Sequence, residues 1–441
     1  MFSLKRVLVF VALVTFALVA ETYAQQISHE DRDLVGYMLK DISGDIKKHY
    51  YDAKLRGVDW DAKAAETKQK IDTSPSLNMA MSHLAAALDA LNDSHTFFLP
   101  PPRPYRHDYG WRSQMIGDRC FVVRVRPGSD AEAKGLKPGD EILKLNGYVP
   151  DRPSFWKMEY VYNVLRPQAG LRLDLRDPEG NDRKLEILAK RIDTKRVADL
   201  SGENGGDDIW DIIRDSETEA NLMRGRSIEL DDDIMVLKIP QFFFTDAEIS
   251  DMMTKARKHK GLVLDLRGNG GGSVETLKSL VGSLFDKEVK IADRVERDKT
   301  QPMLSKPTRH DLYSGKLVVL VDSKSASASE LLARVVQLEK RGVVMGDNSS
   351  GSVMESKRYR YRVGTDRLTF FGASITEADL IMTDGKSLEH VGVVPDEEAI
   401  PTPTDLAAGR DPVLARAVAS LGGKLTSESA GKMFPWEWPK Q

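Results

Sequence analysis

Residues 316–351, KLVVLVDSKSASASELLARVVQLEKRGVVMGDNSSG, decide the fold class of this chain. An apolar run is followed by a serine-rich turn, a stretch with apolar residues at helical spacing, and a second apolar run. Short apolar runs bounded by turn residues are typical of buried strands, whereas three- and four-residue spacing is typical of helices. The stretch therefore predicts a strand, a helix and another strand in succession.

The same alternation extends upstream from residue 316. DIMVLKIPQF (233–242) and GLVLDLRGNGGG (261–272) predict strands, and DAEISDMMTKARKHK (246–260) and SVETLKSLVGSLF (273–285) predict helices. Strands that alternate with helices favour a layered α/β core. We assign residues 233–405 to this core.

Three serines, Ser325, Ser327 and Ser329, lie between the predicted strand and the helix. A nucleophile at this place would be held by rigid elements, beside backbone N–H groups that the first helical turn leaves free to stabilise an oxyanion. The alternative is that one of these serines only caps the helix. The glycines after Asn269 favour catalysis, because they let the backbone approach a ligand closely.

The regions outside the core have different patterns. Residues 1–24 have two basic residues, a short apolar run and the small-residue site TYA, which together predict a cleavable signal peptide; a membrane anchor is the less favoured alternative. Residues 25–105 show helical spacing and end in consecutive prolines. Residues 194–232 are polar and predict a linker, and residues 406–441 predict a helical tail.

Residues 106–193 predict a small β-rich domain, with a hairpin across DPEGN. SDAEAKGLKPGDEILKLNG (129–147) closely resembles the signature of PDZ domains in bacterial proteases. This resemblance implies a domain that binds extended or C-terminal peptides by adding them to a sheet edge. The alternative is a β domain that only packs against its neighbours.

A wider resemblance covers most of residues 106–400. GLVLDLRGNGGG, VVLVDSKSASASELLA, VVMGDNSSGSVM and DGKSLEHVGVVPD occur in the order found in tail-specific or C-terminal processing peptidases, and more broadly in tricorn-type serine proteases. The resemblance implies a crotonase-like or ClpP-like core with an inserted PDZ domain. It implies Ser327 as the nucleophile, with an oxyanion hole made by the N–H of Ala328 and that of Gly271 or Gly272.

The chain departs from the processing peptidases at the base. In that family a lysine follows the glycine of the strand after the catalytic helix, but this chain has Ser352 there. Lys357 lies five residues after Ser352. Residues an odd number of positions apart on a strand point to opposite faces, so Lys357 would face away from the place where the family has its lysine.

Tricorn-type enzymes instead take the base from an upstream Ser-His pair, which here is Ser94-His95, and they use a glutamate that matches Glu389. A histidine suits the role because its pKa lies near the working pH. His390 competes with His95 as the base, and Glu330, one helical turn after Ser327, is a supporting candidate. The alternative for His95 is an ordinary histidine at a helix end.

Composition argues against a nucleic-acid partner, an internal disulfide and a metal site. The 441 residues are 41% hydrophobic and 30% charged, with a formal net charge of −3, which fits a globular protein and argues against nucleic acid as a partner. The single cysteine, Cys120, cannot form an internal disulfide. The isolated histidines do not predict a metal site, and we expect no cofactor.

We therefore expect a secreted or periplasmic serine endopeptidase that hydrolyses unfolded or C-terminally presented polypeptides through an acyl-enzyme on Ser327. The missing lysine favours one alternative, a catalytically inactive scaffold that binds peptides through its PDZ domain. A third hypothesis, an esterase on a crotonase-like fold, fits the PDZ signature less well. The sequence is compatible with an oligomer.

Overall fold

The structure is a computed structural model that describes residues 27–193, 224–307, 312–364, 368–436 and 438. The predicted signal peptide, residues 1–24, lies outside the described residues, as does most of the predicted linker (194–223).

A six-stranded sheet with the strand order β18-β15-β14-β11-β10-β9 forms the centre of the core. All neighbouring strands are parallel except β9, which is antiparallel to β10. Parallel neighbours need crossover connections, which helices provide. The strands are β9 (Arg226–Leu230), β10 (Ile234–Lys238), β11 (Gly261–Asp265), β14 (Lys316–Val321), β15 (Val343–Gly346) and β18 (Glu397–Glu398).

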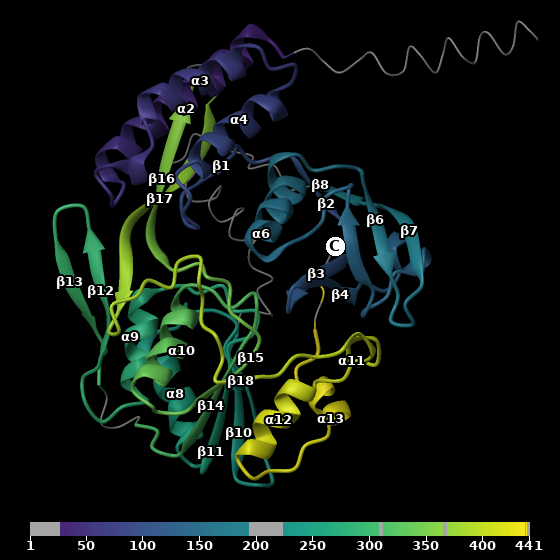
Figure 1. The fold of residues 1–441 in the computed structure, drawn as a ribbon, viewed down its shortest axis with the longest axis vertical. Coiled ribbons are helices and arrows are strands. Elements are labelled where there is room, and N and C mark those ends of the chain that lie inside the picture. The colour runs from purple at the N-terminus through teal and green to yellow at the C-terminus, as the bar shows by residue number, and fades with distance from the viewer. Residues whose placement is uncertain (1–26, 194–223, 308–311, 365–367, 437, 439–441) are drawn as a thin grey trace, which may run out of the picture.

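Helices cover both faces of this sheet (Figure 1). Met235 and Leu237 face the cluster formed with α8 (Asp246–Ala256), α9 (Val274–Gly282) and α10 (Ala328–Leu338). The alternate residues of the same strands face α12 (Pro412–Ser420) and α13 (Ser427–Lys432). A sheet buried on both faces explains why its strands are continuous apolar runs. The predicted layered α/β core is thus observed.

A second, five-stranded sheet carries the N-terminal helices. Its long strand β17 pairs with β1, β12 and β16, and β13 extends the sheet beyond β12. The helices α2, α3 and α4 lie on β16 and β17 (Figure 1). The elements are α2 (His29–His49), α3 (Trp60–Asp72), α4 (Leu77–Asp89), β1 (Phe97–Leu99), β12 (Lys290–Glu296), β13 (Thr300–Leu304), β16 (Met354–Val363) and β17 (Thr369–Met382).

The β-rich domain has its own five-stranded sheet, in the order β3-β4-β5-β6-β7, and its own core. It contacts the core beside the serine turn, because Gln114 donates to Asp322 (2.7 Å) and the Ser323 hydroxyl donates to the carbonyl of Met115. Its elements are β2 (Tyr105–Asp108), β3 (Trp111–Ile116), β4 (Arg119–Val125), α5 (Asp130–Ala133), β5 (Glu141–Leu145), α6 (Arg152–Tyr160), β6 (Gly170–Arg176), β7 (Asp182–Leu188) and β8 (Lys190–Asp193).

Two segments differ from their sequence-based description. Residues 226–230, within the predicted linker, form β9 at the edge of the core sheet. Residues 97–99, within the predicted helical region, form β1 and join the second sheet. None of the helices in the described part of the chain combines the length and apolar character needed to span a bilayer.

Candidate active site

Ser327 lies at a sharp turn between β14 and α10. Its backbone has φ 56° and ψ −118°, a conformation that a non-glycine residue adopts only under strain and that is common at functional sites. The N–H of Ser327 donates to the carbonyl of Ser352 (2.8 Å). The loop after β11 packs closely against the turn: a Cβ added at Gly271 would lie 2.6 Å from the Cβ of Ser327.

The carboxylate of Glu330 is fully buried and accepts four hydrogen bonds. One oxygen accepts from the N–H groups of Ser327 (2.9 Å) and Ser352 (3.0 Å), and the other accepts from the N–H of Gly351 (2.7 Å) and the hydroxyl of Ser349 (2.6 Å). Burial raises the pKa of Glu330 to about 7, although these donors favour the ionised form. Glu330 therefore joins the serine turn to the loop 349–352.

Ser94, His95 and Glu389 are close together in the structure, although 295 positions separate Ser94 from Glu389 in sequence. Glu389 accepts from the backbone N–H of Ser94 (2.6 Å) and from its hydroxyl (2.9 Å). The Ser94 hydroxyl also lies 2.7 Å from Nδ1 of His95. A carboxylate, a hydroxyl and an imidazole thus form a chain.

This chain of contacts fixes the tautomer of His95. The single hydroxyl proton of Ser94 is directed to Glu389, so the Ser94 oxygen accepts from Nδ1–H of His95. The lone pair of the neutral ring is then on Nε2. Burial lowers the pKa of His95 to about 4 and raises the pKa of Glu389. The imidazole is therefore neutral near pH 7, as a general base must be.

The segment Ser352-Val353 connects the two groups of residues. The Ser352 carbonyl accepts from the Ser327 N–H, and the next N–H, that of Val353, donates to Glu389 (2.8 Å). One peptide link therefore contacts the serine turn on one side and the Glu389–Ser94–His95 chain on the other. This places the two parts of the candidate site on adjacent backbone.

The two glycine alternatives for the oxyanion hole differ in the structure. The N–H of Gly271 already donates to the side chain of Asn269 (2.8 Å). Among the described residues, the N–H groups of Gly272 and Ala328 have no hydrogen-bond partner. The arrangement favours Gly272 over Gly271 as the partner of Ala328.

The other candidate bases have different environments. His390 is exposed, and its Nε2 lies 2.9 Å from the carbonyl of Asn92. Lys357 is an exposed residue of β16, with its ammonium 5.4 Å from the centre of the Tyr359 ring. Tyr359 belongs to the cluster under α2, so Lys357 shares the face of the strand that the helices cover.

Two buried side chains at the site were not identified from the sequence. Asp93 accepts from the N–H groups of His95 and Thr96 (2.9 and 2.7 Å) and from the Tyr50 hydroxyl (2.8 Å), and so holds the turn that carries His95. Asn269 binds Gly271 through its side chain, and its carbonyl accepts from the Ser329 hydroxyl (3.0 Å). Both residues lie two or three positions after an apolar segment, and Asp and Asn are favoured in turns for this kind of bond.

Two further observations limit the chemistry. Cys120 is buried, and burial raises the pKa of its thiol to about 12, so it does not form a reactive thiolate. In the parts of the chain that the structure describes, no three His, Cys, Asp or Glu side chains form a group suited to a metal ion.

Comparison with known families agrees with this architecture. The sequence profile of peptidase family S41 matches residues 233–399, and that of the PDZ domain matches residues 102–160. Residues 233–399 of the core thus match peptidase family S41, a family of serine peptidases, and residues 102–160 of the β-rich domain match the PDZ domain. The resemblance to C-terminal processing peptidases is confirmed.

Two relatives illustrate the similarity. The chain is 24% identical over 324 residues to the tail-specific protease of Haemophilus influenzae. This alignment covers 69% of this chain and 43% of that protein. It is 22% identical over 368 residues to carboxyl-terminal-processing peptidase 3 of Arabidopsis thaliana, covering 80% and 66% respectively. The chain thus spans less than two thirds of either relative.

Among solved structures, mature CPAF matches 86% of this chain and 94% of its own with a TM-score of 0.62, at 15% identity. At this identity the match supports the fold alone.

Proposed function

We propose that this protein is a serine endopeptidase in which Ser327 is the nucleophile and His95 the general base. The observation that carries the proposal is the Glu389–Ser94–His95 chain, because it leaves the His95 lone pair on Nε2. It supplies the base that the missing lysine would otherwise provide. The shared segment Ser352-Val353 supports the pairing of this chain with Ser327.

The reaction follows the logic of a catalytic triad. His95 Nε2 takes the hydroxyl proton as Ser327 Oγ bonds to the peptide carbonyl carbon, and the N–H groups of Ala328 and Gly272 bind the resulting oxyanion. The carbon–nitrogen bond then breaks, and the proton passes from His95 to the leaving amine. Water, deprotonated by His95, hydrolyses the acyl-enzyme and restores the Ser327 hydroxyl.

Glu389 and Ser94 keep the imidazole oriented and stabilise its protonated form in these steps. The PDZ domain supports polypeptides as the substrate class, with extended or C-terminal segments recognised at the edge of its sheet. The signal-like sequence of residues 1–24 supports a periplasmic or secreted location.

A fluorophosphonate probe tests the proposal directly, because it labels only an activated serine. The wild-type protein should be labelled, and Ser327→Ala and His95→Ala should each abolish labelling without loss of the folded state. Absence of labelling in the folded wild-type protein would favour the inactive peptide-binding scaffold instead. Loss of labelling in Lys357→Ala but not in His95→Ala would assign the base to Lys357.

A further inference from the structure

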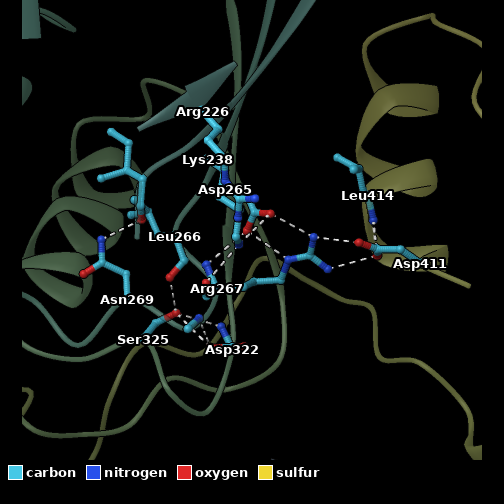
Figure 2. A network of polar contacts seen from close by, with 12 residues as sticks. Arg226, Lys238, Asp265, Leu266, Arg267, Asn269, Asp322, Ser325, Asp411 and Leu414 are labelled. Carbon is cyan, nitrogen blue, oxygen red and sulfur yellow. Dashed lines mark hydrogen bonds and ion pairs between the residues drawn. The ribbon is translucent and has the colours of Figure 1, made fainter. Parts of the chain in front are cut away.

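A largely buried ion-pair network lies where β11 ends and the glycine loop begins (Figure 2). The guanidinium of Arg267 contacts two carboxylates. It donates to Asp265 through Nε and one Nη (both 2.9 Å), and to Asp411 through both Nη atoms (2.9 and 2.8 Å). Two-point contacts of this kind fix the plane of a guanidinium as well as its position.

The network is balanced in charge. Lys238 also contacts Asp265 (3.2 Å), so two cations face two anions. Burial alone would raise the pKa of Asp265 and of Asp411, but the neighbouring Arg267 lowers both below their ordinary values. Removal of the Asp411 charge would leave a net positive charge in a largely buried place, which is costly.

The same residues hold the backbone of the glycine loop. The Arg267 N–H donates to Asp265 (3.0 Å), and the Arg267 carbonyl accepts from Lys238 (3.1 Å). The following N–H, that of Gly268, donates to Asp322 (2.9 Å), which belongs to the serine turn. A displaced Arg267 would therefore shift the loop relative to Ser327.

Asp411 comes from the C-terminal part of the chain, outside the region that matches the peptidase family. It caps α12 by accepting from the Leu414 N–H (2.9 Å), and its own N–H donates to the Ser427 carbonyl (2.9 Å). Figure 2 shows Arg267 reaching from the loop to this helix. The loop is thus anchored to an element that carries none of the proposed catalytic groups.

We propose that Asp411 is a positioning residue for the oxyanion loop and acts on it through Arg267. The C-terminal helix α12 is then part of the framework of the active site. The inference rests on the proposed function, since it concerns the geometry of the same oxyanion hole.

The test compares Asp411→Asn with Asp405→Asn in the full chain. Asp405 is a matched control: it lies in the same C-terminal part and pairs with Arg410 (2.8 Å), but it does not contact the core loop. The readouts are the rate of fluorophosphonate labelling and kcat and KM for an unfolded polypeptide such as casein. Thermal unfolding and circular dichroism report the folded state.

Asp411→Asn should lower kcat and the labelling rate about 10- to 100-fold, as expected for a misplaced catalytic group, with KM nearly unchanged and the protein folded at the assay temperature. Asp411→Glu, which keeps the carboxylate, should recover at least part of the rate, and Asp405→Asn should match the wild type.

Equal labelling of Asp411→Asn and Asp405→Asn would overturn the inference and leave the proposed function intact. A loss of rate explained wholly by the unfolded fraction would also overturn it. Failure of the folded wild-type protein to label would instead overturn the proposed function, and this inference with it.

Discussion

The carboxylate of Glu330 is a single group on which two backbone segments depend. Each of its oxygens accepts two hydrogen bonds, so Glu330→Gln would leave two donors facing an NH₂ group in either orientation of the amide. Each buried donor without an acceptor costs about 1–3 kcal/mol. We expect the free energy of unfolding to fall by about 2 kcal/mol or more, and labelling of Ser327 to fall sharply, as measured by urea denaturation and probe labelling.

Glu339→Gln provides the control for this substitution. Glu339 follows α10, the helix that contains Glu330, but it is partly exposed and pairs with Lys287 at the surface (3.3 Å). Its replacement should change stability by less than about 1 kcal/mol. A Glu330→Gln protein as stable and as reactive as Glu339→Gln would show that the four bonds do not hold the serine turn.

The lowered pKa of His95 predicts how activity depends on pH. The neutral imidazole is the proposed base, so activity is lost as the pH falls through its pKa. Because burial lowers this pKa to about 4, the acid limb of kcat/KM should lie near pH 4. An acid limb near the ordinary histidine value of about 6.5 would contradict the buried, neutral ring.

The same shift affects stability, which must be measured in parallel. The unfolded chain binds a proton on His95 below its ordinary pKa, whereas the folded protein does not until about pH 4. His95 therefore makes the fold progressively less stable as the pH falls through this window. Circular dichroism at each pH separates this effect from titration of the base.

At the scale of elements, the glycine loop after β11 requires glycine at Gly271 but not at Gly270. Gly271 has φ +96°, and an added Cβ would lie 2.6 Å from the Cβ of Ser327 and 2.9 Å from the Ala326 carbonyl. Gly270 has open space at the corresponding point. We expect Gly271→Ala to abolish labelling of Ser327 and Gly270→Ala to retain it. Equal labelling would mean that the loop moves away from the serine turn.

Local pattern was sufficient for the central elements and insufficient for the second sheet. The apolar run of β14 and the helical spacing of α10 each lie within one short window, so their burial can be predicted from neighbours in sequence. A strand at Lys357 was predicted, but β17 and its pairing with β16 were not. The exposed face of β16 carries Arg358, Arg360 and Arg362, and its pairing with β17 depends on contacts that no local window contains.

In the candidate site, too, the local motifs could be predicted from the sequence and the long-range contacts could not. The serine turn and the glycine loop are visible as local motifs. The contact of Ser94 with Glu389 spans 295 positions, and only the family resemblance indicated that the two belong together. The Arg267–Asp411 pair spans 144 positions, and charged residues give no periodic signal that would reveal their partner. Long-range polar contacts are therefore the part that the sequence alone could not provide.

At the scale of the whole molecule, the PDZ domain contacts both the core and the C-terminal segment. Near the serine turn, Arg152 donates to Asp347 (2.5 Å) and to the Asn348 carbonyl (3.0 Å). On the sheet of the PDZ domain, the guanidinium groups of Arg124 and Arg126 lie over the rings of Trp436 and Trp438, at 5.3 and 4.5 Å from their centres. The C-terminal segment thus contacts the PDZ domain, as α12 contacts the glycine loop.

The contact at Arg152 can be tested separately from the C-terminal one. Asp347 is largely buried, and it also accepts from the Gly117 N–H of the PDZ domain (2.9 Å). Arg152→Ala would leave this carboxylate without its cation, a change that costs about 2–5 kcal/mol at interfaces. We expect faster hydrogen exchange in the β3–β4 hairpin and along residues 347–348, with the rest of the core protected.

Arg119→Ala, which removes an exposed pair with Glu141 inside the PDZ domain, should leave exchange at residues 347–348 unchanged. If both variants exchange alike, Arg152 does not hold the two domains together, and the C-terminal tryptophans become the contact to remove next.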